Sequence, residues 1–109
     1  MNLQVVFCNY HTARVAVREK LAFTSPDHLQ EAYRDLKEAF PDSELVVLST
    51  CNRVEVYAAH EDNRHPSQEQ LAQFFAEFHN IPVSEFFDDL LAEQGEEAVR
   101  HLFRVASSV

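Results

Sequence analysis

Four consecutive residues bring a hydroxyl, a thiol, an amide and a guanidinium together: Thr50, Cys51, Asn52 and Arg53. The apolar run Leu45-Val46-Val47-Leu48 precedes them, and a second, largely apolar run follows at residues 54–59. We interpret both runs as strands, so that the polar residues form the tip between them. A thiol beside a guanidinium at such a tip is suited to attack on an acyl group whose carboxylate is held nearby.

Each residue of this tip has a candidate role and an ordinary alternative. A free thiol has a pKa of roughly 8.5, so a nucleophilic Cys51 needs cationic or hydrogen-bonding neighbours. Arg53 provides a cation whose planar fork fits a carboxylate, and Thr50 and Asn52 could bind substrate amino or carbonyl groups. The residues alone leave other interpretations open. Cys51 could be a small hairpin residue, Arg53 a surface partner of Glu55, and Thr50 and Asn52 simple turn residues.

Other reactive residue types do not form a second cluster in the sequence. Cys8 ends an expected strand, and we expect it to be buried and without chemistry. His60 and His65 lack the further ligands that a metal site needs, so no metal is expected. Asp88-Asp89 is expected to lie at a helix end or on a loop rather than to act as a carboxylate pair.

The composition indicates a single soluble, globular domain. The 109 residues are 46% hydrophobic and 25% charged, no run approaches the length of a membrane span, and no leader is visible. Two cysteines do not make a disulfide framework, so we expect a cytoplasmic setting. The net charge of −9 disfavours nonspecific nucleic-acid binding, and the single glycine, Gly95, excludes a glycine-rich dinucleotide loop in this chain.

Hydrophobic periodicity predicts the elements that position the tip. We expect strands at about residues 1–8, half-buried, and at 45–50 and 53–59, with Glu55 and Tyr57 on the face nearer water. Residues 14–21 are expected to form a helical turn or two, residues 84–87 a further turn, and residues 90–94 either a helix or a fourth strand. Helices are expected from Ser25-Pro26 and from the capping-box sequence that begins at Ser67.

A last helix is expected from Glu96, with acidic residues in its first turn. Its predicted buried stripe consists of Val99, Leu102, Phe103 and Ala106. On that helical wheel His101 lies on the polar side, where it would face a site rather than the core. The order of elements predicts an α+β domain with an antiparallel sheet covered by helices on one side.

The tip motif resembles one enzyme family closely. Ser49-Thr50-Cys51-Asn52-Arg53-Val54-Glu55-Val56-Tyr57 is similar to the active-site motif of glutamyl-tRNA reductase, the first committed enzyme of tetrapyrrole synthesis from glutamate. Residues 9–23 resemble the family's opening segment, and residues 98–108 resemble the helix before its Leu-Gly-Glu region. The resemblance spans essentially the whole chain and implies a ferredoxin-like antiparallel sheet of about four strands packed with helices.

The resemblance also implies a reaction and roles. Residues 1–109 would be the N-terminal catalytic, glutamyl-binding domain, cut before the NADPH-binding and dimerisation domains. The family reduces glutamyl-tRNA(Glu) to glutamate-1-semialdehyde with NADPH, through a cysteine thioester. Carried over by motif, Cys51 is the nucleophile, Thr50, Asn52 and Arg53 bind the substrate, and His101 matches a histidine implicated in catalysis. For His101, the alternative is a solvated surface histidine.

The same resemblance implies partners outside this chain: NADPH bound elsewhere, a homodimer formed through a missing C-terminal region, and a downstream aminomutase. This chain departs from the family at Phe7, where glycine is usual, and in the segment Tyr10-His11-Thr12-Ala13-Arg14, where His-Lys-Thr-Ala-Pro is usual. Two other functions compete with this enzyme. One is a ferredoxin-like binding or regulatory module that keeps the motif without activity; the other is a thiol hydrolase, which fits the tip but not the family pattern.

Overall fold

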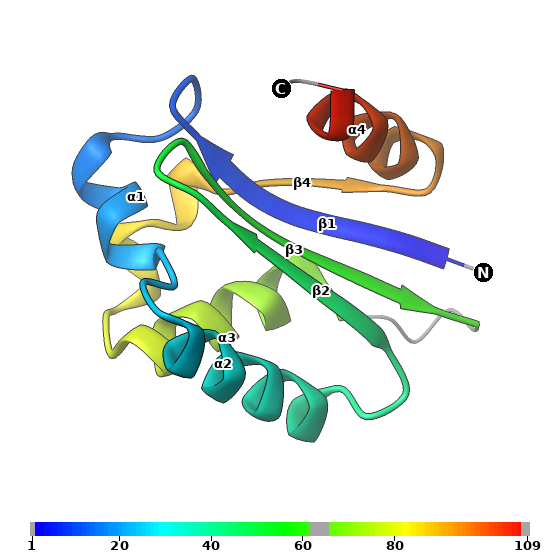
Figure 1. Cartoon of the computed structure of the whole chain (residues 1–109), viewed down its shortest axis with the longest axis horizontal. Coiled ribbons are helices and arrows are strands. Elements are labelled where there is room, and N and C mark those ends of the chain that lie inside the picture. Colours follow the sequence, from blue (N-terminus) through cyan, green and yellow to red (C-terminus); the bar gives the residue numbers. More distant parts are fainter. Residues whose placement is uncertain (1, 62–65, 108–109) are drawn as a thin grey trace.

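The computed structural model describes residues 2–61 and 66–107, and Figure 1 shows their arrangement. The four strands are β1 (Asn2–Asn9), β2 (Glu44–Ser49), β3 (Arg53–His60) and β4 (Leu91–Gln94). The helices are α1 (Val15–Leu21), α2 (Pro26–Ala39), α3 (Gln68–His79) and α4 (Glu96–Ser107), with short 3-10 turns at Val83–Glu85 and Phe87–Asp89. None of the helices in these ranges has the length and apolar character needed to cross a bilayer.

The strands form one antiparallel sheet in the order β2-β3-β1-β4. This arrangement confirms the α+β, ferredoxin-like prediction with about four strands. Residues 91–94 settle as a strand because they pair with residues 4–7 of β1. The short helix after Arg14 and the turns after Pro82 are also present.

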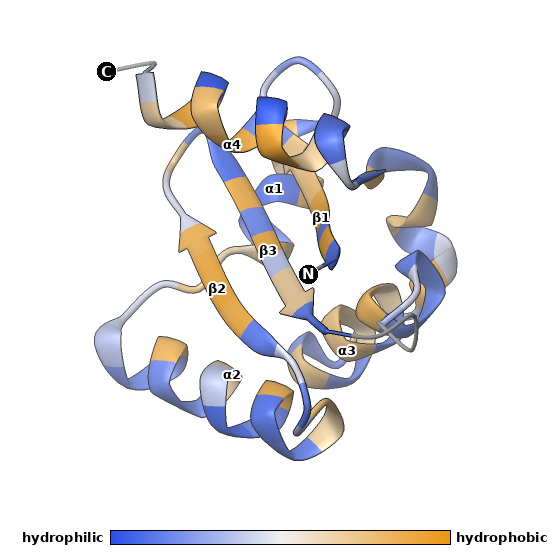
Figure 2. Cartoon of the chain, turned by 90° about the vertical axis from the view of Figure 1, so that its right-hand side faces the viewer, coloured by the Kyte–Doolittle hydropathy of each residue, from blue (hydrophilic) through white to orange (hydrophobic). Residues whose placement is uncertain are grey.

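Helices cover both faces of the sheet, so the prediction of helices on one side was wrong. Figure 2 shows α2 and α3 on one side and α4 on the other. The large core lies under α2 and α3 and contains Val6, Val56, Leu36 and Phe75. A smaller cluster under α4 contains Val5, Phe7, Tyr57 and Ala98. Because α4 follows β4 directly, it returns across the face that the other helices leave open.

This second layer explains why two strands are more buried than predicted. Glu55 and Tyr57 were expected near water, yet Glu55 is 0% exposed and Tyr57 is 5% exposed. On β1, Val5 and Val6 point to opposite faces, and both are fully buried. Alternation along a strand identifies its two faces, but only the rest of the fold decides whether both are covered.

Local sequence signals at the helix ends behave as predicted. The Ser25 side chain accepts a hydrogen bond from the His28 backbone N–H at 3.1 Å, and Pro26 is the first residue of α2. Ser67 and Gln70 form a reciprocal capping box at the start of α3. Asn80 ends α3 in the left-handed conformation, with φ 56°.

The predicted buried stripe of α4 was wrong. Ala98 and His101 face the sheet, whereas Val99 and Leu102 are each 40% exposed and Phe103 is 69% exposed. The wheel assigned the largest apolar residues to the interior. The helix instead turns its histidine inward, because the sheet face beneath it presents the buried carboxylate of Glu55 as a hydrogen-bond partner.

The orientation of α4 can be tested by comparing the effect on stability of the same substitution, phenylalanine to alanine, at a buried and at an exposed position. We expect Phe75→Ala to lower the free energy of unfolding by about 3–5 kcal/mol, because Phe75 is fully buried in the large core. We expect Phe103→Ala to change it by no more than about 0.5 kcal/mol, because its ring lies in solvent. Urea denaturation of the two variants measures both. Comparable losses would contradict the assigned face of α4.

Candidate functional site

The tip between β2 and β3 is a hydrogen-bonded turn. The Thr50 backbone N–H donates to the Arg53 carbonyl at 2.8 Å, and the Asn52 N–H donates to Thr50 Oγ1 at 3.2 Å. The Tyr10 N–H donates to the Asn52 carbonyl at 3.0 Å, which joins the loop after β1 to the tip. Thr50 therefore stabilises the turn, as expected of a simple turn residue. The hydrogen bond from Tyr10 holds the whole turn against the loop after β1.

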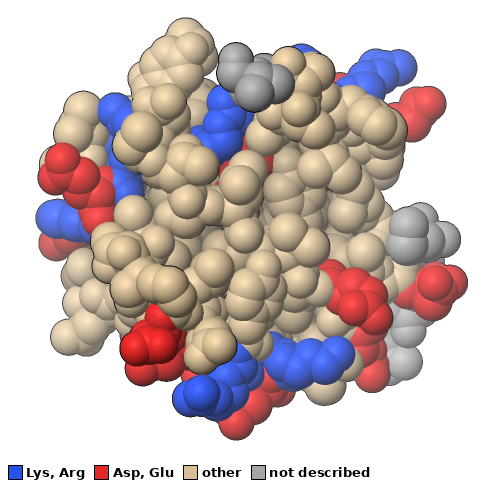
Figure 3. Space-filling model, viewed as in Figure 1, with Lys and Arg blue, Asp and Glu red and all other residues tan. Residues whose placement is uncertain are grey.

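Cys51 lies in this turn and is exposed. Arg18 of α1 donates from Nη1 to the Cys51 carbonyl at 3.0 Å, which brings a guanidinium to the residue that carries the thiol. Figure 3 shows Lys and Arg side chains among acidic ones over α1, at the end of the sheet where the tip lies. Arg18 therefore holds the backbone of the turn at Cys51, and the thiol itself is accessible to a substrate or reagent.

Cys8 has the opposite environment. It is 0% exposed in the large core, and burial raises the pKa of its thiol to about 11. This confirms the expectation that Cys8 is a buried strand residue. The chain thus carries one accessible and one buried thiol, which serve as each other's control.

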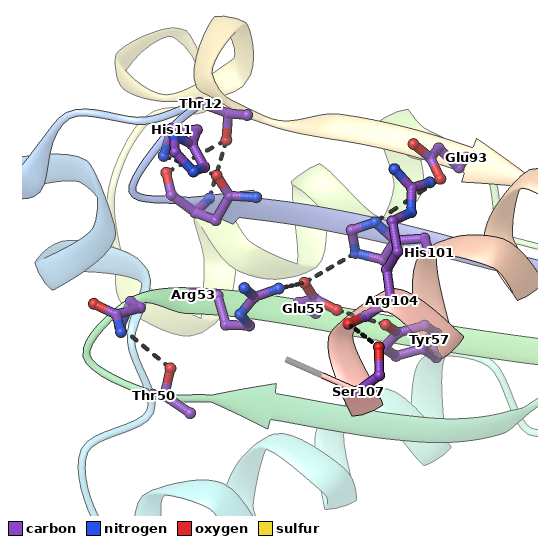
Figure 4. A network of polar contacts seen from close by, with 12 residues as sticks. His11, Thr12, Thr50, Arg53, Glu55, Tyr57, Glu93, His101, Arg104 and Ser107 are labelled. Atoms are coloured by element: carbon purple, nitrogen blue, oxygen red, sulfur yellow. Dashed lines mark hydrogen bonds and ion pairs between the residues drawn. The ribbon is translucent and has the colours of Figure 1, made fainter. Parts of the chain in front are cut away.

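A polar network lies behind the tip, under α4 (Figure 4). Its centre is Glu55, whose Oε2 lies 3.2 Å from Arg53 Nη1 and 3.0 Å from His101 Nε2. The Tyr57 hydroxyl donates to the other carboxylate oxygen, Oε1. Burial and the hydrogen bond to Glu55 raise the pKa of Tyr57 well above its ordinary value, so the phenol remains protonated and donates.

His101 was predicted to lie on the polar side of its helix, and the structure corrects that position. It is 7% exposed and faces the sheet, which excludes the alternative of a solvated surface histidine. Its ring packs on Phe7 with centroids 4.0 Å apart. The other ring nitrogen, Nδ1, lies 3.9 Å from Glu93 Oε2. His101 nonetheless reaches a pocket, as expected, but from the inner face of α4.

That pocket has a volume of about 300 Å³ and opens between the end of α4 and the loop after β1. Arg53 and His101 both line it, together with Phe7, Asn9, Tyr10, His11, Arg104 and Val105. A larger groove between α2 and α3 lies on the opposite face of the sheet and contains none of the predicted site residues. The structure therefore brings Arg53 and His101 together, while Thr50, Cys51 and Asn52 occupy the adjoining tip.

Arg53 is not a surface partner of Glu55. Its side chain is 20% exposed and that of Glu55 is 0% exposed, so the pair is largely buried. Sequence reasoning missed Glu55 and Tyr57 as members of the site. The available signal was the period of two in β3, which places Arg53, Glu55 and Tyr57 on one face.

The remaining sequence candidates lie elsewhere. His60 is buried at the end of β3, and His65 lies outside the described residues. Asp89 pairs with Arg14 at 3.1 Å in the turn after Phe86, which is a structural contact. Within residues 2–61 and 66–107, no group of three or more His, Cys, Asp or Glu side chains could hold a metal ion.

The two thiols allow a direct test of the tip. We expect iodoacetamide at pH 8 to modify Cys51 at least about 100-fold faster than Cys8. The Cys8 thiol, with its pKa near 11, is ionised at roughly one part in a thousand at this pH and is shielded as well. Mass spectrometry of the peptides after timed quenching measures both rates. Equal and low reactivity of the two thiols would contradict a reactive Cys51 and favour a binding module.

Comparisons with known proteins agree with the geometry. The family model described as "Glutamyl-tRNAGlu reductase, N-terminal domain" matches residues 6–109. A glutamyl-tRNA reductase of Thermodesulfovibrio yellowstonii is 42% identical over 100% of this chain and 27% of its own length. One of Citrifermentans bemidjiense is 41% identical over 100% of this chain and 25% of its own length.

A solved structure agrees as well. Glutamyl-tRNA reductase from Methanopyrus kandleri matches with a TM-score of 0.69 and 40% sequence identity, over 96% of this chain and 22% of the solved one. The chain spans about a quarter of the length of the curated relatives it matches. Because the family model covers all but the first few residues, the chain belongs to the family of glutamyl-tRNA reductase N-terminal domains.

Proposed function

We propose that this chain is the catalytic, glutamyl-binding domain of an NADPH-dependent glutamyl-tRNA reductase, which forms glutamate-1-semialdehyde for tetrapyrrole synthesis. The observation that carries the proposal is the exposed Cys51 on a fixed turn, two residues from an arginine that lines a pocket with His101. Relatives named glutamyl-tRNA reductase along the whole chain support it.

The step assigned to this domain is thioester formation. The Cys51 thiolate attacks the carbonyl carbon of the glutamyl ester, and a sulfur–carbon bond forms. The bond from that carbon to the ribose oxygen of the tRNA breaks, and the oxygen leaves with a proton. A thioester accepts hydride far more readily than an ester does, so this exchange prepares the acyl group for reduction.

Arg53 is the proposed site for the side-chain carboxylate of the glutamyl group. A guanidinium has five N–H donors in a planar fork. Among the described residues, Glu55 is its only hydrogen-bond acceptor, and the side chain borders the pocket. Donors that do not contact Glu55 are available for a bidentate contact with a ligand carboxylate. Thr50 and Asn52, on the adjoining turn, are proposed to hold the polar groups around the reacting carbonyl.

His101 is proposed to polarise the reacting group or to transfer the proton that the leaving oxygen requires. Because it borders the same pocket as Arg53, a glutamyl group held at Arg53 would lie beside it. Buried between Phe7 and Glu55, it has a fixed orientation. An imidazole with a fixed orientation can be held in the geometry that proton transfer to a bound substrate requires, which a mobile imidazole adopts only part of the time.

The residues described here do not fit a dinucleotide. The single glycine, Gly95, lies at the start of α4 away from the pocket, and no glycine-rich loop can form. NADPH, which supplies the hydride when bound, is therefore proposed to be held by the part of the relatives that lies beyond this region. Homodimerisation through that part, a downstream aminomutase partner and a cytoplasmic location belong to the same proposal.

A chimera tests the function. This chain would replace the corresponding quarter of the Thermodesulfovibrio yellowstonii reductase, in a bacterial strain that lacks its own enzyme and requires 5-aminolevulinate. We expect the chimera to restore growth and Cys51→Ser to abolish it. In an assay of the purified chimera, we expect His101→Asn to lower turnover by about 10²- to 10⁴-fold, as loss of a proton-transfer group does. His28→Asn, on the opposite side of the sheet, serves as the control. Unchanged turnover in His101→Asn would exclude its catalytic role, and no activity in a folded chimera would favour a binding module.

Arg53 can be tested through substrate choice. We expect the chimera to prefer glutamyl-tRNA over glutaminyl-tRNA, which lacks the side-chain carboxylate. Arg53→Lys keeps the charge but loses the bidentate contact, so the ratio of kcat/KM values should fall by about tenfold or more. An unchanged ratio would contradict a carboxylate contact at Arg53. Lys37→Arg, an exposed residue of α2, is the matched control for the exchange between the two cations.

A further inference from the structure

The loop after β1 presents an exposed aromatic pair beside the tip. Tyr10 is 54% exposed, and its ring lies against that of His11, with centroids 3.9 Å apart and planes 39° from parallel. Both residues border the pocket that Arg53 and His101 line. An aromatic ring that remains in solvent at the edge of a pocket is available to stack on a planar group of a ligand.

The loop that carries this pair is held by local hydrogen bonds. The Asn9 side chain accepts from the His11 N–H at 2.9 Å, and Thr12 Oγ1 accepts from the Asn9 N–H at 3.0 Å. The Tyr10 N–H donates to the Asn52 carbonyl at 3.0 Å. Figure 4 shows the loop at the same end of the sheet as the turn between β2 and β3. The Tyr10 backbone is therefore fixed next to the turn that carries the thiol, while its ring remains available.

Arg18 reaches the same turn from α1. Its Nη1 donates to the Cys51 carbonyl at 3.0 Å, next to the carbonyl that Tyr10 binds. Within residues 2–61 and 66–107 this is its only hydrogen bond. Its Nε is buried without a partner, whereas Nη2 has no partner and is not buried. The guanidinium is thus anchored beside Cys51 and keeps a donor that a ligand can reach.

The other cations of this segment are already paired. Arg14 Nε lies 3.1 Å from Asp89 Oδ2, and Lys20 Nζ lies 3.5 Å from Glu85 Oε2. In the part of the chain that the structure describes, Arg18 has no carboxylate partner of this kind. Since the chain has a net charge of −9, an unneutralised cation beside the tip is a specific place for an anionic group such as a phosphate.

We propose that Tyr10 and Arg18 bind the acceptor end of the RNA whose ester Cys51 attacks: the Tyr10 ring stacks on the terminal base, and the Arg18 guanidinium binds the phosphate that joins the last two nucleotides. The identity of the RNA rests on the proposed function. In an aminoacyl ester the acyl carbon is bonded to the terminal ribose. When the sulfur attacks, the base and the nearest phosphate are therefore each one sugar away from the reacting carbon.

The two contacts suit an end of this kind. Unpaired bases of RNA are commonly held by stacking on aromatic side chains, and the backbone is held by cations. Neither contact reads the base sequence, and the single-stranded CCA end is common to all tRNAs. Tyr10 and Arg18 are thus expected to contribute affinity for the nucleotide part of the substrate, whereas Arg53 selects the glutamyl group.

Binding of a CCA trinucleotide to the chain, followed by NMR, tests the site without any acyl transfer. We expect the Tyr10 ring signals and the Arg18 guanidinium signals to shift as the trinucleotide is added. Tyr10→Ala should raise the Kd by about tenfold, as loss of a stacked aromatic does, and Tyr10→Phe should keep it within about twofold. Phe103→Ala, at another exposed aromatic residue, is the matched control and should leave the Kd unchanged.

An uncharged ligand tests the phosphate contact separately. In a second trinucleotide, a methylphosphonate without charge replaces the last phosphodiester. We expect Arg18→Met to raise the Kd of the natural trinucleotide by about tenfold and to leave that of the neutral one within about twofold. Lys20→Met, on the same helix, is the control and should change neither. A variant that only distorted the turn at Cys51 would weaken both ligands alike.

The parent chain covers the case in which Arg18→Met does not fold, because its Arg18 signals should shift with the natural trinucleotide and not with the neutral one. Equal shifts of Arg18 with both ligands would overturn the proposal. So would the absence of a shift at Tyr10, or equal losses of the two ligands in a folded Arg18→Met.

The chimera separates this proposal from the proposed function. We expect Tyr10→Ala and Arg18→Met each to raise the KM for glutamyl-tRNA by about tenfold. An active chimera whose KM is unchanged in both variants would overturn the nucleotide contacts and leave the proposed function intact. Trinucleotide binding at Tyr10 and Arg18 together with an inactive chimera would show that the proposed function fails and that the nucleotide site stands.

Discussion

A carboxylate with no exposure to solvent constrains everything around it. Removing an ionised group from water costs several kcal/mol unless donors replace the lost hydration. Glu55 meets this demand with Arg53, Tyr57 and His101. Two of these donors come from β3, and the third obliges α4 to turn its histidine toward the sheet. The orientation of the last helix, and the exposure of Phe103 on its outer side, follow from this single requirement.

The same constraint relates the fold to the site. The β1–β3 register places Phe7 opposite Glu55 and Asn9 opposite Arg53, so the face under α4 becomes polar toward the tip. The pocket opens at that end, next to the turn that carries Cys51. The large core under α2 and α3 plays no direct part in the site. It holds β2 and β3 in place, and with them the turn at residues 50–52.

The sequence predicted most of the fold, because local signals decided most of it. The caps at Ser25 and Ser67 depend only on near neighbours, and the structure bears them out. The alternation in β3 identified the two faces of that strand but not that both are buried. The face of α4 depended instead on a partner 46 residues away, since Glu55 draws His101 inward. A helical wheel ranks residues by hydropathy and does not account for a hydrogen-bond acceptor on another element, such as the Glu55 carboxylate.

The sequence named part of the candidate site but missed Glu55 and Tyr57 and the contacts that connect the site. The tip motif identified Thr50, Cys51, Asn52 and Arg53, and His101 came from the family resemblance. Glu55 was considered only as a surface partner of Arg53, because nothing local indicated that a helix would cover it. Its role became visible once the fold placed α4 over β1 and β4. Buried polar networks are assembled from distant segments, which is why local patterns miss them.

The most direct test of the central claim, that Cys51 is the acyl-accepting nucleophile, is the intact mass of the chain after incubation with glutamyl-tRNA. The account predicts a glutamyl adduct on the parent chain and none on Cys51→Ser, with Cys8 still present in both. An adduct that persists in Cys51→Ser would contradict the account. So would the absence of any adduct from both the chain and the chimera with a full-length relative.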